Sequence, residues 1–215
     1  MGSLLQTAER MDLYTTLCNM NDVNRKARRL CSYTAWHDQT DAAIIENDYM
    51  LYKKNIKVVI LNPSADGGMP HTRASNIICL PAHCRDSPQT LKETIRHELV
   101  HIDQRQHPDL WRDKLLEDGW LPDSSTNESV PKELADRCRL NPDTLQCRFP
   151  AWEGRYIPLP LFEREDKPDL RQIVVRWWDT EVERLRVDPP VSYIRKYGNK
   201  SISSMEHPYE LWAYK

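Results

Sequence analysis

The pattern of apolar and polar positions predicts a short series of helices and strands in the first half of the chain. In residues 3–30, five apolar positions recur at spacings of three and four, which predicts one amphipathic helix with a single buried stripe. Residues 56–61 (IKVVIL) are apolar and largely β-branched, and Asn62-Pro63 follows them with turn chemistry, so they predict a strand. The stripe of the helix consists of Leu4, Ala8, Met11, Tyr14 and Cys18.

A second apolar run, residues 76–80, ends at Pro81 and predicts another strand, because proline cannot donate to the ladder of a sheet. We expect this strand to pair near the first one. At the edge of the sheet it would be a candidate for binding an extended substrate, since peptides commonly add a strand to an exposed edge. An interior position is the alternative. The run consists of Asn76, Ile77, Ile78, Cys79 and Leu80.

The best-defined helix of the chain follows this second strand. Thr90 and Glu93 match the T-x-x-E capping box, which predicts the N-terminus of the helix. Beyond them, four apolar residues fall on one face of the helix and predict the side that packs against a core. These residues are Leu91, Ile95, Leu99 and Ile102.

The chain changes character between residues 121 and 190, which hold nine of its fifteen prolines. Prolines interrupt long elements, so we interpret this range as a turn-rich insertion. Within it, the periodicity of residues 171–187 leaves helix and strand open. Residues 203–215 predict a short helix with Pro208 in its first turn. We therefore expect one α+β domain over residues 1–215, with the insertion at about 121–190.

Composition excludes several classes of function. Thirty basic and 32 acidic residues give a net charge of −2, so we expect no nucleic-acid partner. No stretch reaches the roughly 20 apolar residues of a membrane span, and the N-terminus lacks a signal peptide, so we expect neither membrane insertion nor secretion. The six cysteines form no CxxC pair, which favours reduced thiols in an intracellular compartment, cytoplasmic or nuclear.

The sequence His97-Glu98-Leu99-Val100-His101 carries the strongest chemical signal. The two histidines are four residues apart, so both imidazoles lie on one face of the helix and can reach a single metal ion. Zinc held by two histidines and a third protein ligand keeps a fourth position for water and lowers the pKa of that water to about 7. Glu98 can take the proton of that water and pass it to a leaving amine. The motif predicts one zinc ion and hydrolysis of a peptide bond.

Residues 207–214 (HPYELWAY) supply the first candidate for the third ligand, because Glu210 would complete a set of two histidines and one glutamate. The pairing of HELVHIDQ with HPYELWAY resembles the gluzincin-type zinc metallopeptidases, in which a later helix carries a glutamate ligand. The resemblance implies an α+β zincin-like fold, with the HExxH helix under a small sheet and the glutamate on a C-terminal helix. It also implies that His97, His101 and Glu210 bind zinc and that Glu98 is the general base.

The same resemblance implies that Tyr209, Tyr214 or His207 stabilises the oxyanion of the reaction. The chain departs from the best-known gluzincins at Tyr214, because those peptidases have an acidic residue there that orients a ligating histidine.

His107 is an alternative third ligand, because residues 97–107 read HExxHxxxxxH. This spacing resembles that of the metzincins and of minimal peptidases that process DNA–protein crosslinks. Metzincins have glycine where Gln104 stands, whereas some of the minimal peptidases lack that glycine. The sequence leaves both ligands open, with Glu210 the first candidate.

We therefore expect a zinc-dependent metallopeptidase, an endopeptidase rather than an exopeptidase, that acts on a peptide or protein substrate. A zincin-like protein that has lost its activity and binds partners through the Pro-rich insertion is the alternative from another class.

Overall fold

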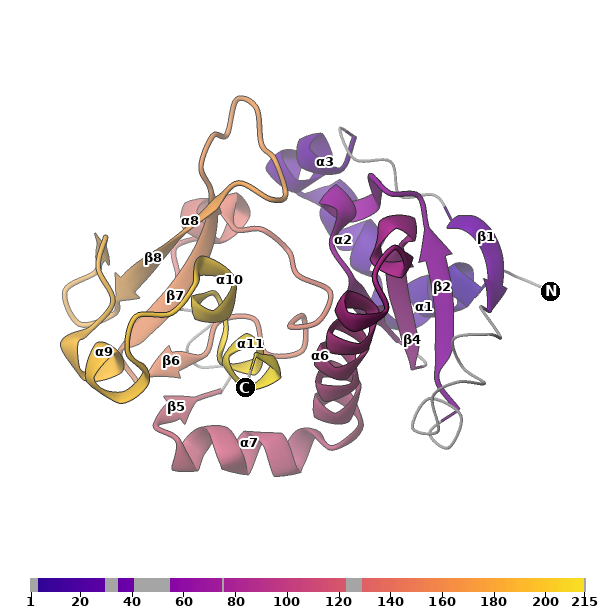
Figure 1. Ribbon diagram of the computed structural model, residues 1–215. Helices are drawn as coiled ribbons and strands as arrows, with labels where there is room; N and C mark the ends of the chain where they lie inside the picture. The colour runs from indigo at the N-terminus through magenta and orange to yellow at the C-terminus, as the bar shows by residue number, and fades with distance from the viewer. Residues whose placement is uncertain (1–3, 30–34, 41–54, 75, 123–128, 215) are drawn as a thin grey trace. The chain divides into compact units, whose positions relative to one another are not determined.

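The computed structural model describes residues 4–29, 35–40, 55–74, 76–122 and 129–214 (Figure 1). Helices and strands are mixed along the chain, so the fold is α+β. The chain divides into two compact units, residues 1–102 with 140–145, and residues 103–139 with 146–215. The expectation of a single domain stays a prediction. No helix in the described part of the chain is long and apolar enough to cross a membrane.

Three short helices replace the single helix that the N-terminal pattern predicts. The backbone leaves helical geometry at Leu13, whose φ is 53°, and again at Asn21, which is extended. Tyr14 and Cys18 are buried as predicted, whereas Met11, in the last turn of the first helix, is 63% exposed. The helices are α1 (Leu4–Asp12), α2 (Tyr14–Met20) and α3 (Asp22–Arg29).

A four-stranded sheet in the order β1-β2-β4-β3 forms the centre of the first unit. β2 and β4 are parallel, which confirms that the two predicted strands pair. β4 also pairs with β3, so both of its edges are used, and the expectation that residues 76–80 form a substrate-binding edge strand is wrong. The edge on this side of the sheet is β3, where Asp143 Oδ1 accepts the amide hydrogen of Thr72 at 2.7 Å. The strands are β1 (Ala35–Thr40), β2 (Lys57–Leu61), β3 (His71–Arg73) and β4 (Ile77–Pro81).

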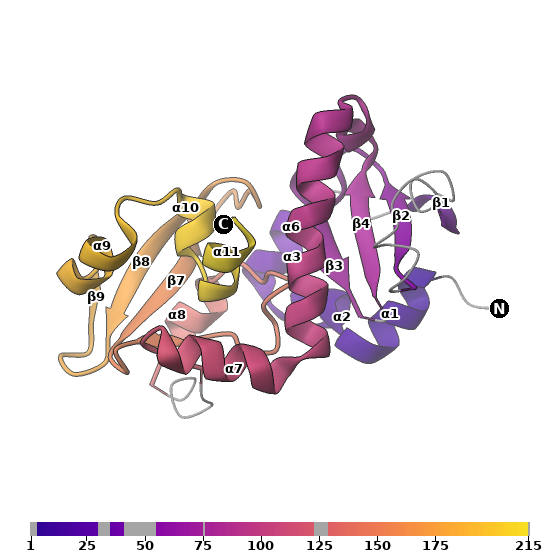
Figure 2. The ribbon, with the colours of Figure 1, turned by 60° about the horizontal axis from the view of Figure 1, so that its bottom comes forward.

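Alternation along the strands gives this sheet two apolar faces. Figures 1 and 2 show α1 on one face and α6 (Pro88–Gln106) on the other. Val59 and Leu61 pack toward Ala8 of α1. The alternate positions of the same strand, Val58 and Ile60, pack toward the apolar residues predicted to line α6. The α6 face of the sheet is formed by Val58, Ile60, Ile78 and Leu80.

The helix α6 begins one turn earlier than the capping box predicts. Ser87 is the cap, since its Oγ accepts the amide hydrogen of Thr90 at 3.3 Å and Pro88 opens the helix. Glu93 accepts a hydrogen bond from Gln89 instead of closing the predicted box. Two short 3₁₀ turns, η1 (Ala65–Gly68) and η2 (Ala82–Arg85), lie before the helix.

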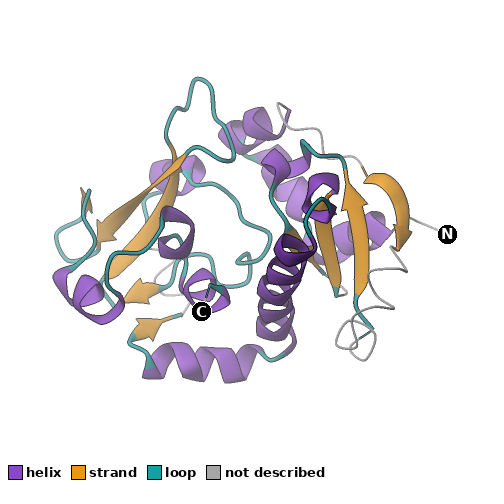
Figure 3. Ribbon diagram, viewed as in Figure 1, coloured by secondary structure: helices purple, strands orange, loops and turns teal. Residues whose placement is uncertain are grey.

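The second unit is built on a five-stranded antiparallel sheet in the order β5-β6-β7-β8-β9 (Figure 3). Much of the range expected to be an irregular insertion therefore forms regular strands. Pro158 and Pro160 are accommodated within β7 because two prolines two residues apart leave their missing donors on the same side of the strand. The strands are β5 (Trp120–Leu121), β6 (Ala151–Trp152), β7 (Tyr156–Phe162), β8 (Ile173–Asp179) and β9 (Arg184–Arg186).

Aromatic side chains fill one side of this second sheet. The rings of Trp120 and Trp152 have centroids 5.4 Å apart, and Tyr193 contacts both of them. Trp177 joins this cluster while its neighbour Trp178 packs on the opposite face, as alternation requires. The helices of the unit are α7 (Pro108–Glu117), α8 (Lys132–Arg137), α9 (Val191–Tyr197), α10 (Ile202–Met205) and α11 (Pro208–Ala213).

A buried ion pair joins α1 to β3 in the first unit and predicts a pH dependence. Arg73 is fully buried and donates to both carboxylate oxygens of Asp12, at 2.7 and 2.8 Å. Burial by itself raises the pKa of Asp12, but the hydrogen bonds from Arg73 and Ala74 outweigh it and hold the pKa below its ordinary value of 3.8. This stabilisation is fully present above pH 3.8 and is lost as the pH falls through the lowered pKa.

We expect Asp12→Asn to lower the free energy of unfolding at pH 7 by roughly 1.5–3 kcal/mol, the range for hydrogen bonds to charged groups. The loss should shrink as the pH falls below 3.8, because the parent then loses the same interaction. Urea unfolding at pH 7 and pH 3 measures both effects. Asp22→Asn is the control, since Asp22 pairs with Arg25 and Lys26 on an exposed helix surface and should not change stability measurably. Equal effects of the two substitutions would contradict the prediction.

Candidate metal centre

The two histidines of the HExxH motif lie one turn apart on α6 and point toward each other. Their Nε2 atoms are 3.0 Å apart, and their rings are nearly perpendicular, with an interplanar angle of 73°. Two nitrogen ligands at the usual zinc distance lie about 3.3 Å apart in a tetrahedral site. The pair is therefore close to the separation that a single zinc ion requires. His101 is fully buried, whereas His97 is partly exposed.

Packing against the first sheet decides which way these histidines face. Ile95 and Ile102 are buried in the core under the sheet. At 100° per residue, His97 and His101 fall roughly on the opposite side of the helix from that apolar stripe. The burial that holds α6 on the sheet thus leaves the two imidazoles turned away from the core.

Glu98 follows the first histidine and is 2% exposed. Within the first unit its negative charge affects the pKa of the Cys84 thiol, which belongs to the turn η2 before α6. The pKa of Cys84 is raised to about 11, first by burial and then by the negative charges of Glu98 and Asp86. The Cys84 thiol therefore stays protonated at neutral pH.

The candidate glutamate ligand lies in the second unit, on the short helix α11. Pro208 opens this helix and His207 caps it, because His207 Nδ1 accepts the amide hydrogen of Tyr209 at 3.0 Å. The other ring nitrogen of His207 donates to the carbonyl oxygen of Cys147. The two bonds assign the Nε2–H tautomer to a neutral ring. Glu210 is 5% exposed and lies in the first turn of the helix that this cap begins.

Further contacts inside the second unit hold α11. The last turn of α6 belongs to this unit, and there Gln104 Nε2 donates to the carbonyl oxygen of Tyr209 at 3.1 Å. Trp111 of α7 packs edge-on against Tyr209 and Trp212, and its indole N–H donates to Asp103. Sequence reasoning assigned no role to Gln104 or Trp111. The sequence feature that could have indicated a role for Gln104 is its position, three residues after His101 on the same face of the helix.

His97, His101 and Glu210 form a group that could hold a metal ion. One ligand atom from each residue lies within 4.8 Å of the others. Two imidazoles and a carboxylate are a donor set that suits zinc and leaves a position for water, although other divalent metals also accept these donors.

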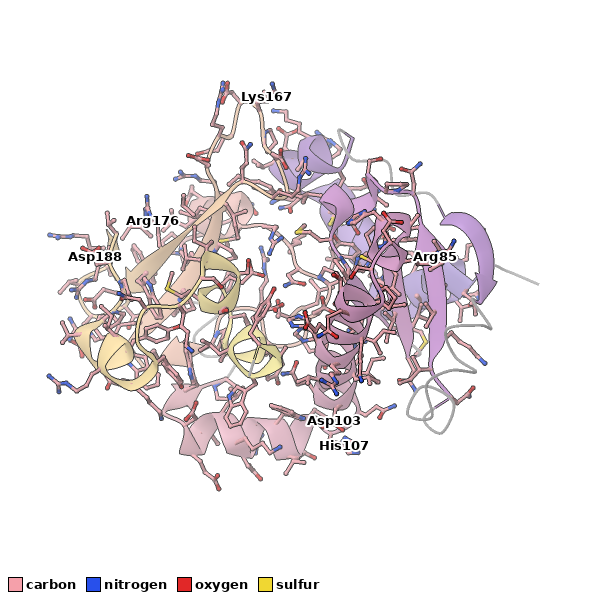
Figure 4. All side chains as sticks on the ribbon, in the orientation of Figure 1. Arg85, Asp103, His107, Lys167, Arg176 and Asp188 are labelled. Atoms are coloured by element: carbon pink, nitrogen blue, oxygen red, sulfur yellow. The ribbon has the colours of Figure 1, made fainter. Side chains whose placement is uncertain are left out.

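His107, the alternative third ligand, lies outside this group. It follows the end of α6, and its ring Nδ1 is 3.2 Å from Asp103 Oδ1. Its side chain is 53% exposed, and Figure 4 shows it beside Asp103. Among the residues that the structure describes, the group that could hold a metal contains Glu210 and not His107.

The three residues expected to stabilise an oxyanion occupy different environments. Both ring nitrogens of His207 bond to the backbone, so its role as a helix cap replaces the expected one. Tyr209 is buried against Trp111, and burial raises its pKa, so the phenol stays protonated. Tyr214, at the end of α11, is 57% exposed. The oxyanion role stays a prediction for the two tyrosines.

Comparisons with known proteins give no relative for this chain. No family model, no curated protein and no solved structure matches it.

The cap of α11 yields a test of how Glu210 is held. We expect His207→Ala to lower the free energy of unfolding by about 1 kcal/mol, because a helix loses its cap and the buried carbonyl of Cys147 loses a donor. His207→Asn should recover most of this loss, since asparagine caps helices well. Urea unfolding of the three proteins measures the difference. Equal stability of His207→Ala and the parent would show that the cap does not support α11.

Proposed function

We propose that this protein is a zinc-dependent metallopeptidase of the gluzincin type. The proposal is carried by one observation, the approach of His97, His101 and Glu210 to within 4.8 Å of one another. The order of the ligands supports the gluzincin assignment, because two come from the HExxH helix and the third from a glutamate on a later helix. Glu98, on the same helix as the two histidines, supplies the base that hydrolysis needs.

Each protein group has a defined part in the proposed reaction. Zinc, when bound, polarises the peptide carbonyl and lowers the pKa of water. Glu98 accepts a proton from the attacking water as the new C–O bond forms, and it returns that proton to the amine nitrogen as the C–N bond breaks. His97 and His101 would hold the ion through ring nitrogens and Glu210 through its carboxylate, a set of one negative charge that would leave a divalent ion with net positive charge to act as a Lewis acid.

The proposed substrate is a peptide or protein, cleaved within the chain. The net charge of −2 gives no general attraction for nucleic acid, which disfavours the crosslink-processing alternative. The position of His107, exposed and beside Asp103, also favours Glu210 as the third ligand over the metzincin-like arrangement.

We expect the parent to bind one zinc ion per chain and Glu210→Ala to lose most of it, because two histidines alone leave the site one ligand short. His107→Ala should retain the zinc of the parent and is the matched control. Elemental analysis of the three proteins, purified identically and checked for folding by circular dichroism, makes the measurement. Loss of zinc with His107→Ala and not with Glu210→Ala would favour the metzincin-like site. A folded parent that binds no supplied zinc would refute the metallopeptidase.

We expect Glu98→Gln to keep its zinc but to lose peptidase activity by roughly 10²–10⁴-fold, because the amide cannot accept the proton of water. Cleavage of a quenched fluorescent peptide library by the zinc-loaded proteins measures this effect. Glu93→Gln, an exposed change five residues earlier on the same helix, is the control and should retain full activity. Equal activity of Glu98→Gln and the parent would remove Glu98 from the mechanism. Zinc binding without cleavage in the parent would leave a metal-containing binding protein.

A further inference from the structure

The helix that carries Glu210 is too short to position it alone. α11 spans six residues, Pro208–Ala213, whereas isolated helices shorter than about 12 residues are marginal in water. Its orientation must therefore come from contacts with other elements. Glu210 lies in the first turn of this helix, so the direction of its carboxylate depends on the same contacts.

One of these contacts comes from the helix that carries the histidines. Gln104 is 2% exposed, and its amide Nε2 donates to the carbonyl oxygen of Tyr209 at 3.1 Å, across 105 positions of sequence. Gln104 is three residues after His101, on the same face of α6. Tyr209 directly precedes Glu210. A single buried hydrogen bond thus joins the helical turn that follows His101 to the residue that precedes Glu210.

We propose that Gln104 is a positioning residue of the candidate metal centre, which holds α11 to the last turn of α6 within the second unit and so sets the direction of Glu210. The proposal rests on the metallopeptidase function proposed above. Gln104 does not bind the metal and takes no part in proton transfer. It acts through the backbone of Tyr209, so its removal should disturb the placement of Glu210 while it leaves the two histidines in position.

The chemistry of the amide suits this role. A glutamine donates to a carbonyl without adding charge, whereas a glutamate at the same place would repel Glu210 and compete with it for a cation. Trp111 supports the same helix from α7, with its ring centroid 6.3 Å from that of Tyr209 and its indole N–H bonded to Asp103, the residue before Gln104. Neighbouring residues of α6 therefore fix α11 both directly and through α7.

The chain offers a matched pair of substitutions for the test. Gln104→Met removes the donor but nearly keeps the length and helix propensity of the side chain. Gln106→Met makes the same change two residues later, at an exposed position of α6. Zinc affinity is measured by competition with a chromophoric chelator, and the ligand field by the visible absorption of the cobalt-substituted proteins. Hydrogen exchange of the metal-free proteins reports the protection of the α11 amides.

We expect Gln104→Met to weaken zinc binding by about tenfold, the lower end of the range for residues that orient metal ligands, and to alter the cobalt spectrum. Exchange within residues 208–213 should speed up in Gln104→Met even without metal, while exchange within 88–100 should not change. Gln106→Met should match the parent in all three measurements. Unchanged zinc affinity together with unchanged exchange in α11 would overturn the proposal.

The hydrogen-exchange result separates this proposal from the proposed function. A parent that binds no zinc would refute the metallopeptidase, yet faster exchange in α11 of Gln104→Met would still establish that Gln104 positions this helix. Gln104→Asn, whose amide is one methylene shorter, provides a second variant if the methionine protein does not fold. Loss of the cooperative thermal transition in both variants would overturn the positioning role, because Gln104 would then support the whole unit and not α11 in particular.

Discussion

The rotation of α6 about its own axis is the constraint that sets the direction of the two histidines of the candidate metal centre. Burial of Ile95 and Ile102 against the first sheet holds the helix at one angle, since turning it would expose these side chains to water. That angle directs His97 and His101 away from the core, with their Nε2 atoms 3.0 Å apart. The sheet sets the direction of the two histidines without contributing a residue to the site, because fixing the buried face of a helix also fixes the direction of its other faces.

The contribution of the second unit is of a different kind, because α11 has no long apolar stripe to orient it. Several specific contacts take the place of extensive burial. His207 caps the helix and is bonded to the carbonyl of Cys147, while the preceding Glu206 forms a buried ion pair with Arg139 at 2.5 Å. Gln104 and Trp111 add contacts from α6 and α7. Such a helix can be placed accurately, but its placement is sensitive to the loss of a single partner.

Much of the fold could be predicted from local patterns, and the exceptions have local physical causes. The β-branched run over residues 56–61 predicted β2, and the spacing of apolar residues predicted α6. The predicted N-terminal helix breaks at Leu13, which adopts a left-handed conformation that no periodicity reveals. Pro158 and Pro160 suggested irregular structure, yet they lie in a strand because their spacing matches its two-residue repeat.

The sequence by itself determined the two histidines and the glutamate between them, since a spacing of four residues brings two side chains to one face of a regular helix. Only the tertiary structure brought Glu210 into a group with them that could hold a metal, paired His107 with Asp103 and made β4 an interior strand. The reason is the range of the interactions involved. Residues near in sequence are related by backbone geometry, whereas Gln104 and Tyr209 meet across 105 positions through the burial and packing of the whole second unit.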